Sequence, residues 1–180
     1  MSPKSKKVLA VILGILIVIV LLLLAGAWKA GIFEEPEITL ELRGPHHYVY
    51  LQKTGDFSMI AKAYEEADGL FKDQSIDKGT ACGMYLDDPA MVQPEDMRWR
   101  VGYLVSDSME VNAPLEYLII PNTEYAVASI DAHPMVAPFK TYPALQEWVK
   151  TSEYQFIGPA YEIYNENGII EVLFPVEKRK

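Results

Sequence analysis

Residues 85–105, YLDDPAMVQPEDMRWRVGYLV, place an acidic, proline-containing segment between two short runs of apolar and aromatic residues. The runs from Cys82 to Leu86 and from Trp99 to Val105 contain the residue types that strands favour. The segment between them, Asp87 to Met97, contains two prolines and is typical of a loop. The stretch therefore predicts two strands joined by an acidic loop.

Two strands and a helix are predicted before this hairpin. Hydrophobicity alternates from Ile38 to Arg43 and from Tyr48 to Leu51, as expected of strands with one buried face. A helix is predicted from Phe57 to Phe71, because apolar residues recur there at spacings of three and four: Ile60, Ala63, Tyr64, Ala67 and Phe71. The first half of the chain thus has the order strand, helix, strand, strand.

The second half repeats this order with different residues. Its predicted strand, helix and two strands lie over Tyr125 to Ile130, Lys140 to Lys150, Tyr161 to Asn165 and Ile169 to Val176. Tyr48 and Tyr85 in the first half are 37 positions apart. The matching residues of the second half, Tyr125 and Tyr161, are 36 apart, so corresponding strands recur at nearly the same interval.

The two halves are expected to pack as one domain. Aligning WRVGYLV with IEVLFPV places Arg100 opposite Glu171. Two such repeats, over about residues 38–106 and 115–176, are expected to share a core, because neither half alone offers much apolar surface to bury. The sequence therefore predicts an α+β fold with a duplicated β-α-β-β repeat and a groove along a pseudo-twofold axis.

The chain begins with a long apolar segment. Val8 to Ala27 forms about 20 residues without a charge, which at 1.5 Å per residue span a hydrocarbon core of roughly 30 Å. We therefore predict a basic tail over 1–7, a single transmembrane helix over 8–28 and a linker over 29–37. The alternative is a cleavable signal peptide, because residues 25–27 (AGA) resemble a cleavage site.

The charges that flank this segment predict its orientation. Lys4, Lys6 and Lys7 precede it, and acidic residues follow soon after it. The positive-inside rule then places the N-terminus in the cytoplasm. The C-terminal domain is expected on the extracytoplasmic side, in the periplasm or the extracellular space.

Charge and composition limit the partners of the remaining chain. All 25 acidic residues and 12 of the 16 basic ones follow Phe33, which leaves that part with a net charge of −13. A field of this sign repels nucleic acid and favours cationic or neutral partners. The single cysteine, Cys82, excludes an internal disulfide.

Neither a cofactor nor a metal site is predicted. Asp87 and Asp88 are adjacent, but calcium loops need about six or more oxygen ligands at regular spacing, so turn chemistry explains the pair better. His46 and His47 would face opposite sides of a strand, and His133 lies in a predicted loop. The common hydrolase and nucleotide-binding motifs are absent from the sequence.

Four segments in a fixed order resemble the GyrI-like small-molecule-binding domain, the effector-binding module of some AraC-type and multidrug-responsive regulators. They are DDPAMVQPEDMRWRVGYLV, IPNTEYAV, LQEWV and GPAYEIYNENGIIEVLFPV. The resemblance covers about residues 38–176 and leaves a short tail over 177–180. An N-terminal anchor before such a domain is similar to a membrane-anchored branch of the family, which includes an animal receptor for ER turnover.

The resemblance implies a ligand groove between the repeats and a preference for amphipathic, often cationic, compounds. Some members of the family look like hydrolases of reactive cyclopropane-bearing compounds. The sequence lacks the DNA-binding domain of the related regulators, so we expect no transcriptional role.

Two carboxylates are predicted to face the groove. Glu171 is the single charge in the apolar run IIEVLFPV, and Glu162 shares a strand face with Tyr164. Either acid would neutralise a ligand cation or, if burial raises its pKa, act as a general base on water. The alternative is an exposed carboxylate or, for Glu171, an ion pair with Arg100.

Aromatic residues are predicted to wall the groove: Tyr85, Trp99, Tyr103, Trp148, Tyr161 and Tyr164. For Trp99 and Tyr103 the simpler alternative is core packing against the helices, because they share one face of their strand. Gly102, on the other face, would allow close approach of another backbone or of a flat ligand.

The sequence thus predicts a membrane-tethered domain that binds a small amphipathic molecule, cationic or neutral. One alternative is a hydrolase of electrophilic small molecules in which Glu162 or Glu171 activates water. In that case a tyrosine such as Tyr85 or Tyr161 would donate a proton to the leaving group. Another alternative is an adaptor that holds an unidentified protein partner near the bilayer.

Overall fold

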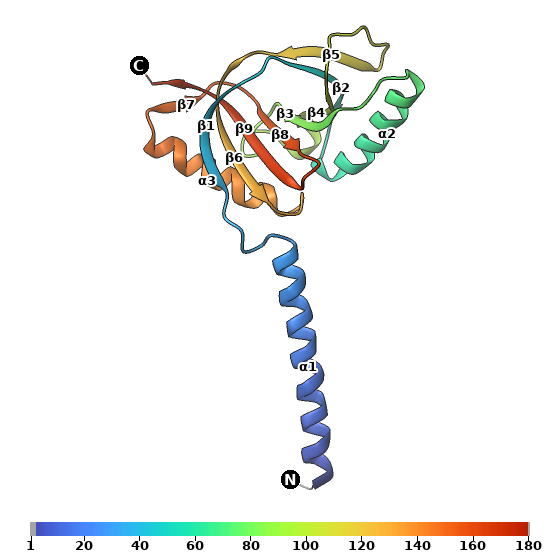
Figure 1. Cartoon of the computed structure of the whole chain (residues 1–180), viewed down its shortest axis with the longest axis vertical. Coiled ribbons are helices and arrows are strands. Elements are labelled where there is room, and N and C mark those ends of the chain that lie inside the picture. The colour runs from blue at the N-terminus through green and yellow to red at the C-terminus, as the bar shows by residue number, and fades with distance from the viewer. Residues whose placement is uncertain (1–2, 180) are drawn as a thin grey trace.

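The computed structural model describes residues 3–179, which form one long N-terminal helix followed by a mixed α+β domain (Figure 1). The helix, α1, spans Pro3–Lys29. The strands are β1 (Glu37–Arg43), β2 (His46–Thr54), β3 (Thr80–Tyr85), β4 (Arg98–Val105), β5 (Leu115–Ile120), β6 (Thr123–Asp131), β7 (Tyr154–Phe156), β8 (Ala160–Tyr164) and β9 (Ile169–Lys178). The other α-helices are α2 (Ile60–Asp73) and α3 (Ala137–Thr151). The predicted α+β class and the N-terminal apolar helix are confirmed.

The strands form an antiparallel sheet in the order β1-β6-β9-β8-β3-β4-β2-β5, and β7 pairs with the end of β9. The two repeats meet at the centre, where β3 pairs with β8 and Gly83 lies opposite Glu162. The first strand of each repeat is exchanged, because β1 pairs with β6 and β5 pairs with β2. Each repeat therefore completes the sheet of the other.

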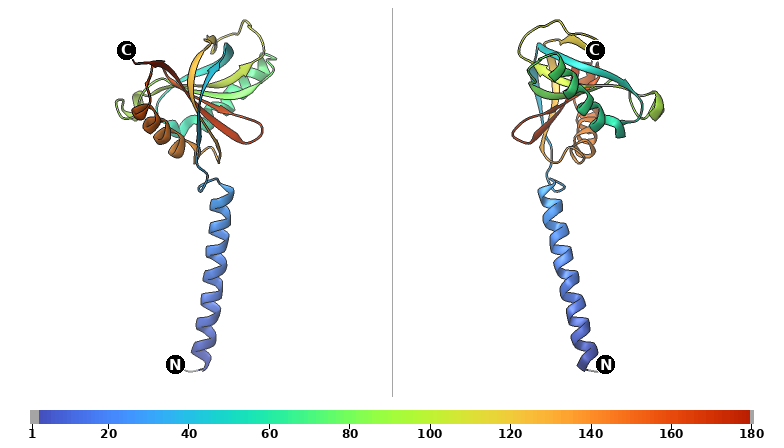
Figure 2. Two further views of the ribbon diagram at one scale, coloured as in Figure 1. Left: turned by 60° about the vertical axis from the view of Figure 1, so that its left-hand side comes forward. Right: turned by 90° about the vertical axis from the view of Figure 1, so that its right-hand side faces the viewer.

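Both helices of the domain pack on the same face of the sheet, α2 on β2 and β4 and α3 on β6 and β9 (Figure 2). The buried residues of α2 are Ala63, Ala67 and Phe71. Those of α3 are Ala137, Thr141, Leu145 and Val149. A spacing of four residues keeps each set on one stripe of its helix, so each helix seals a separate hydrophobic core.

The opposite face of the sheet has an aromatic core of its own. Its buried members are Tyr48, Tyr50, Cys82, Met84, Ile120, Tyr125, Val127, Tyr161, Ile163 and Leu173. Tyr48 stacks on Tyr50 with 5.2 Å between ring centroids, and Tyr125 packs edge to face on Tyr161 at 6.0 Å. The sheet is therefore buried on both faces although the helices cover only one.

Three details of the secondary structure differ from the prediction. β5 was not predicted, because LEYLII ends in consecutive apolar residues that obscure strand alternation. β7 has three residues, too few for any periodicity. α3 begins at Ala137, before the predicted start at Lys140, because Pro138 fits a first helical turn, where its missing N–H costs nothing.

Gly102 of β4 lies where the backbone of β2 passes very close. A Cβ atom at this position would lie 2.0 Å from the carbonyl oxygen of Val49 and 2.7 Å from Cα of Tyr50.

We expect Gly102→Ala to lower the free energy of unfolding of the full chain by about 2–4 kcal/mol, measured by denaturation in detergent. The control is Gly69→Ala in α2, where an added Cβ meets nothing within 4 Å. This change should stabilise the protein by about 0.5–1 kcal/mol, and similar effects of the two substitutions would contradict the close approach.

Candidate functional site

A cavity of about 720 Å³ lies between α3, the loop that follows β3, and the strands β8 and β9. A volume of this size accommodates a drug-sized molecule. The aromatic residues of its wall are Phe57, Tyr85, Phe139, Tyr142, Phe156 and Phe174. They come from both repeats, so the cavity exists only when the two halves are assembled.

Glu162 lines this cavity from the central strand β8 and is 3% exposed. Its carboxylate accepts hydrogen bonds from three tyrosine hydroxyl groups. Tyr142 donates to Oε1 at 2.9 Å, and Tyr85 and Tyr164 donate to Oε2 at 3.2 Å and 2.5 Å. The three donors belong to α3, β3 and β8, so a buried acid is held by phenol groups from three different elements.

Burial raises the pKa of the Glu162 carboxyl above its ordinary value of 4.5, and the tyrosine hydrogen bonds only partly offset this effect. Each hydrogen bond to a charged group contributes about 1.5–3 kcal/mol. Removing a carboxylate from water costs several kcal/mol even after relaxation. Burial is also the main cause of the raised pKa values of Tyr85, Tyr142 and Tyr164, which therefore stay protonated at neutral pH and act as donors.

The rim of the cavity is acidic. Asp88 is exposed at the rim, and its side chain accepts from the backbone N–H of Ala90 at 2.8 Å. Asp87 also lines the cavity, but Arg98 holds its two carboxylate oxygens with Nη2 at 2.7 Å and Nε at 3.0 Å. Among the described residues that line the cavity there is no Lys, Arg or His. Asp87 is already paired with Arg98, so Asp88 and Glu162 are the carboxylates that favour a positively charged occupant.

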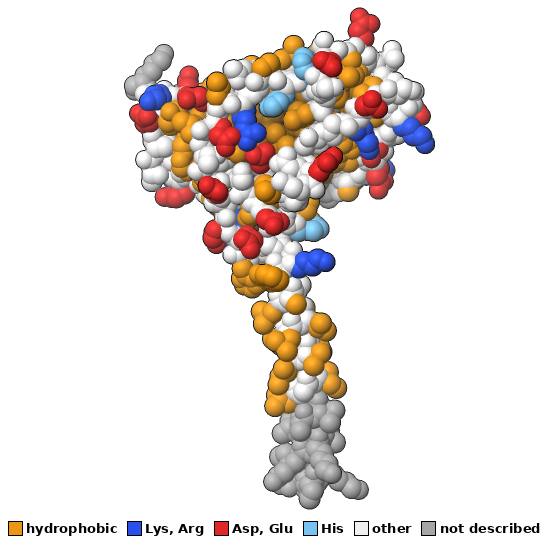
Figure 3. Space-filling model, in the orientation of Figure 1, with side chains coloured by type: hydrophobic (Ala, Val, Ile, Leu, Met, Phe, Trp, Pro, Cys, Tyr) orange, Lys and Arg blue, Asp and Glu red, His pale blue; other side chains and the backbone are white. Residues whose placement is uncertain are grey.

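Acidic side chains also spread over the face of the domain shown in Figure 3, whereas the described part of α1 presents hydrophobic ones. Within residues 3–179, no group of three or more His, Cys, Asp or Glu side chains is arranged to hold a metal ion. A second cavity, on the opposite face of the sheet, measures about 10 Å³. That is room for about one water molecule, so it is not a ligand site.

Two residues predicted to bind ligand line the large cavity, Tyr85 and Glu162, whereas Tyr164 lies outside its wall and contacts Glu162. Glu162 and Tyr164 lie on the same face of β8, as strand alternation predicts, and they are joined by a hydrogen bond. Tyr85 comes from β3, which pairs with β8 at the centre of the sheet. The pairing of these two strands is what brings the tyrosine of the first repeat to the acid of the second.

Trp99, Tyr103 and Trp148 lie in the cores beneath the helices and not in the wall of the cavity. Trp99 is 1% exposed, and its indole N–H donates to the carbonyl oxygen of Gly55 at 2.8 Å. The hydroxyl of Tyr103 donates to Asp68 of α2. Trp99 and Tyr103 pack under α2 and Trp148 lies in the core under α3, so these rings support the fold and do not line the cavity.

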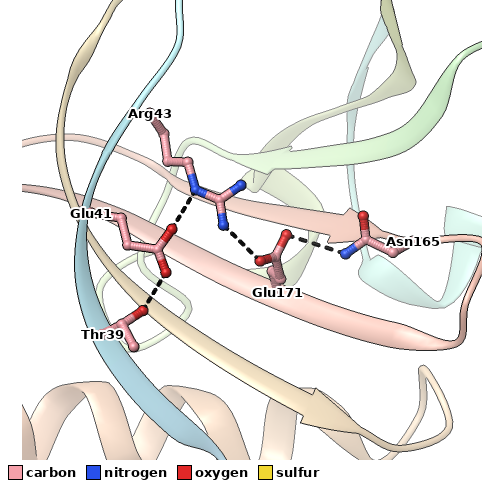
Figure 4. A network of polar contacts seen from close by, with 5 residues as sticks. All are labelled: Thr39, Glu41, Arg43, Asn165 and Glu171. Carbon is pink, nitrogen blue, oxygen red and sulfur yellow. Dashed lines mark hydrogen bonds and ion pairs between the residues drawn. The ribbon is translucent and has the colours of Figure 1, made fainter.

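Tyr161 and Glu171 lie on the opposite face of the sheet from Glu162. Glu171 forms an ion pair with Arg43 at 2.9 Å and accepts from the amide of Asn165 at 3.1 Å, as Figure 4 shows. Arg43 also contacts Glu41 at 2.7 Å. This network connects β1 to β9 across β6, so the carboxylate of Glu171 has a structural partner in the folded chain.

Arg100 does not pair with Glu171, which the repeat alignment left open. Its Nε donates to Gln52 at 3.0 Å, and its guanidinium lies 4.5 Å from the ring centroid of Tyr50. The reason is the strand order, since β8 and β3 lie between β9 and β4. Three strand spacings of roughly 4.8 Å separate the two side chains by about 14 Å.

The sequence-based prediction missed the cavity face of α3. Phe139, Tyr142, Pro143 and Gln146 all line the cavity and recur at spacings of three and four. The predicted helix began at Lys140 and used only its sheet-facing stripe. Of these four residues only Phe139 lies outside the predicted helix, and a start at Ala137 would have shown that it shares this stripe with Tyr142.

A duplicated α+β sheet with a drug-sized cavity around one buried carboxylate defines a small-molecule-binding domain. The chain belongs to the family described as the GyrI-like small molecule binding domain, whose model matches residues 36–177. The family resemblance drawn from the sequence is therefore confirmed. No curated protein matches the sequence.

Solved structures share this fold at low sequence identity. The EcmrR C-terminal domain is 16% identical, with a TM-score of 0.67 over 80% of this chain and 99% of that one. SAV2435 bound to tetraphenylphosphonium is 15% identical, with a TM-score of 0.59 over 78% of this chain and 94% of that one. A hydrolase from Listeria innocua is 12% identical, with a TM-score of 0.55 over 79% of this chain and 92% of that one. At such identities the likeness shows the fold alone.

The buried acid makes the stability of the ligand-free protein depend on pH. Because the pKa of Glu162 is raised in the folded chain, its ionisation opposes folding once the pH rises above the ordinary value of 4.5. We expect Glu162→Gln to stabilise the full chain at pH 7 by about 1 kcal/mol, because glutamine keeps an acceptor oxygen without a buried charge. Denaturation at pH 4 should show almost no difference, and an equal gain at both pH values would contradict a charge effect.

The matched control is Glu171→Gln. The side chain of Glu171 is 14% exposed and that of its partner Arg43 is 32% exposed. Removing this pair should lower the stability at pH 7 by up to about 1 kcal/mol, opposite in sign to the Glu162 substitution.

Proposed function

We propose that the cavity binds a small amphipathic molecule and prefers a cationic one. The observation that carries the proposal is the ionisable Glu162 buried among aromatic rings, with a pKa raised by burial. A ligand cation would stabilise the carboxylate in place of the water that burial has removed. The rings of Tyr142 and Phe139 add faces that attract positive charge. The structure of SAV2435 with tetraphenylphosphonium, a lipophilic cation, supports the same class of ligand.

The apolar wall suits the rest of such a molecule. Filling the cavity removes apolar surface from water, which contributes about 25 cal/mol per Å². The hydrophobic part supplies affinity, while the single buried acid selects the charge. Hydrophobic contact with the wall and charge selection by Glu162 are therefore separate contributions to binding.

Tetraphenylphosphonium at about 100 times its Kd should stabilise the full chain by about 2.7 kcal/mol. For a domain of this size that is a rise in Tm of roughly 5–10 °C. We expect Glu162→Gln to weaken binding about tenfold or more, which would reduce the rise to about half or less at the same concentration. Glu171→Gln should keep the full rise, because that carboxylate is paired with Arg43 on the other face. If Glu171→Gln alone abolished the rise in Tm, the ligand would bind on the opposite face of the sheet, and the proposal would be contradicted.

A second candidate function is hydrolysis of an electrophilic small molecule. The observation in its favour is the contact of 3.2 Å between Tyr85 and Glu162 within the cavity. The carboxylate would take a proton from water as the water attacks, and the Tyr85 hydroxyl would protonate the leaving group. Tyr161 lies on the other face and does not suit this role. Turnover that disappears in Glu162→Gln would favour hydrolysis over simple binding.

We also propose that α1 anchors the domain in a membrane. Its segment Ile12–Lys29 is apolar enough to cross a bilayer, and none of this segment is buried against the rest of the protein. At 1.5 Å per residue its 18 residues extend about 27 Å. Trp28 and Lys29 at its end suit the lipid interface. The three lysines before the segment favour a cytoplasmic N-terminus and an extracytoplasmic domain.

Alkaline extraction and protease protection of cell membranes test this anchor. The full-length chain should stay in the membrane pellet, and its domain should be degraded only by protease added from the extracytoplasmic side. A shortened chain released into the soluble fraction would instead indicate cleavage after residue 27.

A further inference from the structure

We propose that the rim of the cavity lies on the bilayer surface, so that the site receives lipophilic cations from the lipid interface and not from bulk water. This inference rests on the proposed function, because it needs both the anchor and the ligand cavity. It adds the source of the ligand and the orientation of the domain above the membrane.

The linker that follows α1 is packed onto the domain. The N–H of His133 donates to the carbonyl of Ala30 at 3.1 Å, and Lys140 donates to the carbonyl of Glu34 at 2.5 Å. Gly31 is buried with φ +72°, and a Cβ there would lie 2.5 Å from a backbone oxygen of β6. These contacts fasten the segment just beyond the helix to the end of β6, to the loop that follows it and to the first turn of α3.

This packing places one side of the cavity beside the end of the anchor. In Figures 1 and 2 the N-terminal end of α3 lies just above the top of α1. Pro138 and Phe139, in the first turn of α3, line the cavity. The apolar segment ends at Lys29, and the headgroup layer beyond the hydrocarbon extends only about 5–7 Å on each side. The rim formed by the first turn of α3 therefore lies at the level of the lipid headgroups.

The segments that meet at this point carry exposed apolar side chains. The exposed side chains Trp28, Ile32, Phe33, Met135 and Phe139, which we call the junction patch, are 72%, 46%, 58%, 76% and 83% exposed. Aromatic and apolar residues at this depth are typical of a lipid interface. Trp28 belongs to α1 itself, so the bilayer that holds the helix is the surface nearest to the patch.

The local charges agree with this arrangement. The acidic linker would be repelled by anionic lipid, but Lys140 pairs with the Glu35 carboxylate at 3.4 Å and so offsets one of its charges. A lipophilic cation at the interface keeps its apolar groups in lipid and its charge near the headgroups. From there it would meet Phe139 at the rim, and then the carboxylates of Asp88 and Glu162.

Fluorescence quenching tests the position of the rim. The full chain is placed in phosphatidylcholine vesicles with an environment-sensitive dye on Met135→Cys or on Ile119→Cys. Both positions are exposed and apolar, and Ile119 lies on β5 at the end of the domain away from α1 (Figure 1). Native Cys82 is buried, so it does not take the dye. We expect lipids that carry a quencher in the headgroup to reduce the dye fluorescence about twofold or more at position 135 and not at 119. Equal quenching at the two positions would overturn the proposal.

Ligand kinetics test the source of the ligand. In the same vesicles, association of tetraphenylphosphonium should slow about threefold or more in Phe33→Ser/Met135→Ser, in which neither residue lines the cavity. Ile119→Ser should keep the parental rate. An unchanged rate in the double variant would overturn delivery from the lipid. If the parent is quenched at position 135 but binds no tetraphenylphosphonium, the proposed ligand class fails while the placement of the rim is supported.

Discussion

The buried carboxylate of Glu162 is the constraint on which the site depends. An acid that is 3% exposed is tolerated only where donors surround it, and here three tyrosine hydroxyls reach it from β3, α3 and β8. Those elements come from both repeats, so satisfying one acid requires the central β3–β8 pairing and the docking of α3 together. The hydrogen bonds that hold Glu162 in the cavity therefore form only when the two repeats are assembled.

The sheet separates two acids that look alike in the sequence. Glu162 and Glu171 each stand among apolar strand residues, yet the pairing of β8 with β9 directs them to opposite faces. Glu162 accepts hydrogen bonds from neutral tyrosine hydroxyls, whereas Glu171 forms an ion pair with Arg43 on the exchanged strand β1. A carboxylate already paired with an arginine attracts a ligand cation weakly, whereas a carboxylate held only by neutral phenol groups attracts it strongly.

The organisation of the fold was accessible from local patterns. Two sets of alternating and helical segments at nearly equal intervals indicated a duplicated β-α-β-β unit, and the family match agrees. The shared face of Glu162 and Tyr164 followed from strand alternation alone. Tyr142 was not accessible in this way, because the start of α3 and its second stripe were not recognised. The placement of Trp99 and Tyr103 depended on where α2 docks, which periodicity does not specify.

The apolar N-terminal helix, the repeat, the acidic character and the strand faces are predictable from the chain alone, because they depend on residue type and spacing. The folded structure is needed to show which face holds the cavity, which acid has an arginine partner, and how the linker fastens α3 beside the end of α1. These features depend on contacts between residues far apart in sequence, such as Arg43 with Glu171 or Tyr85 with Glu162. The exchange of β1 and β5 between the repeats sets the strand order, and no local pattern encodes that order.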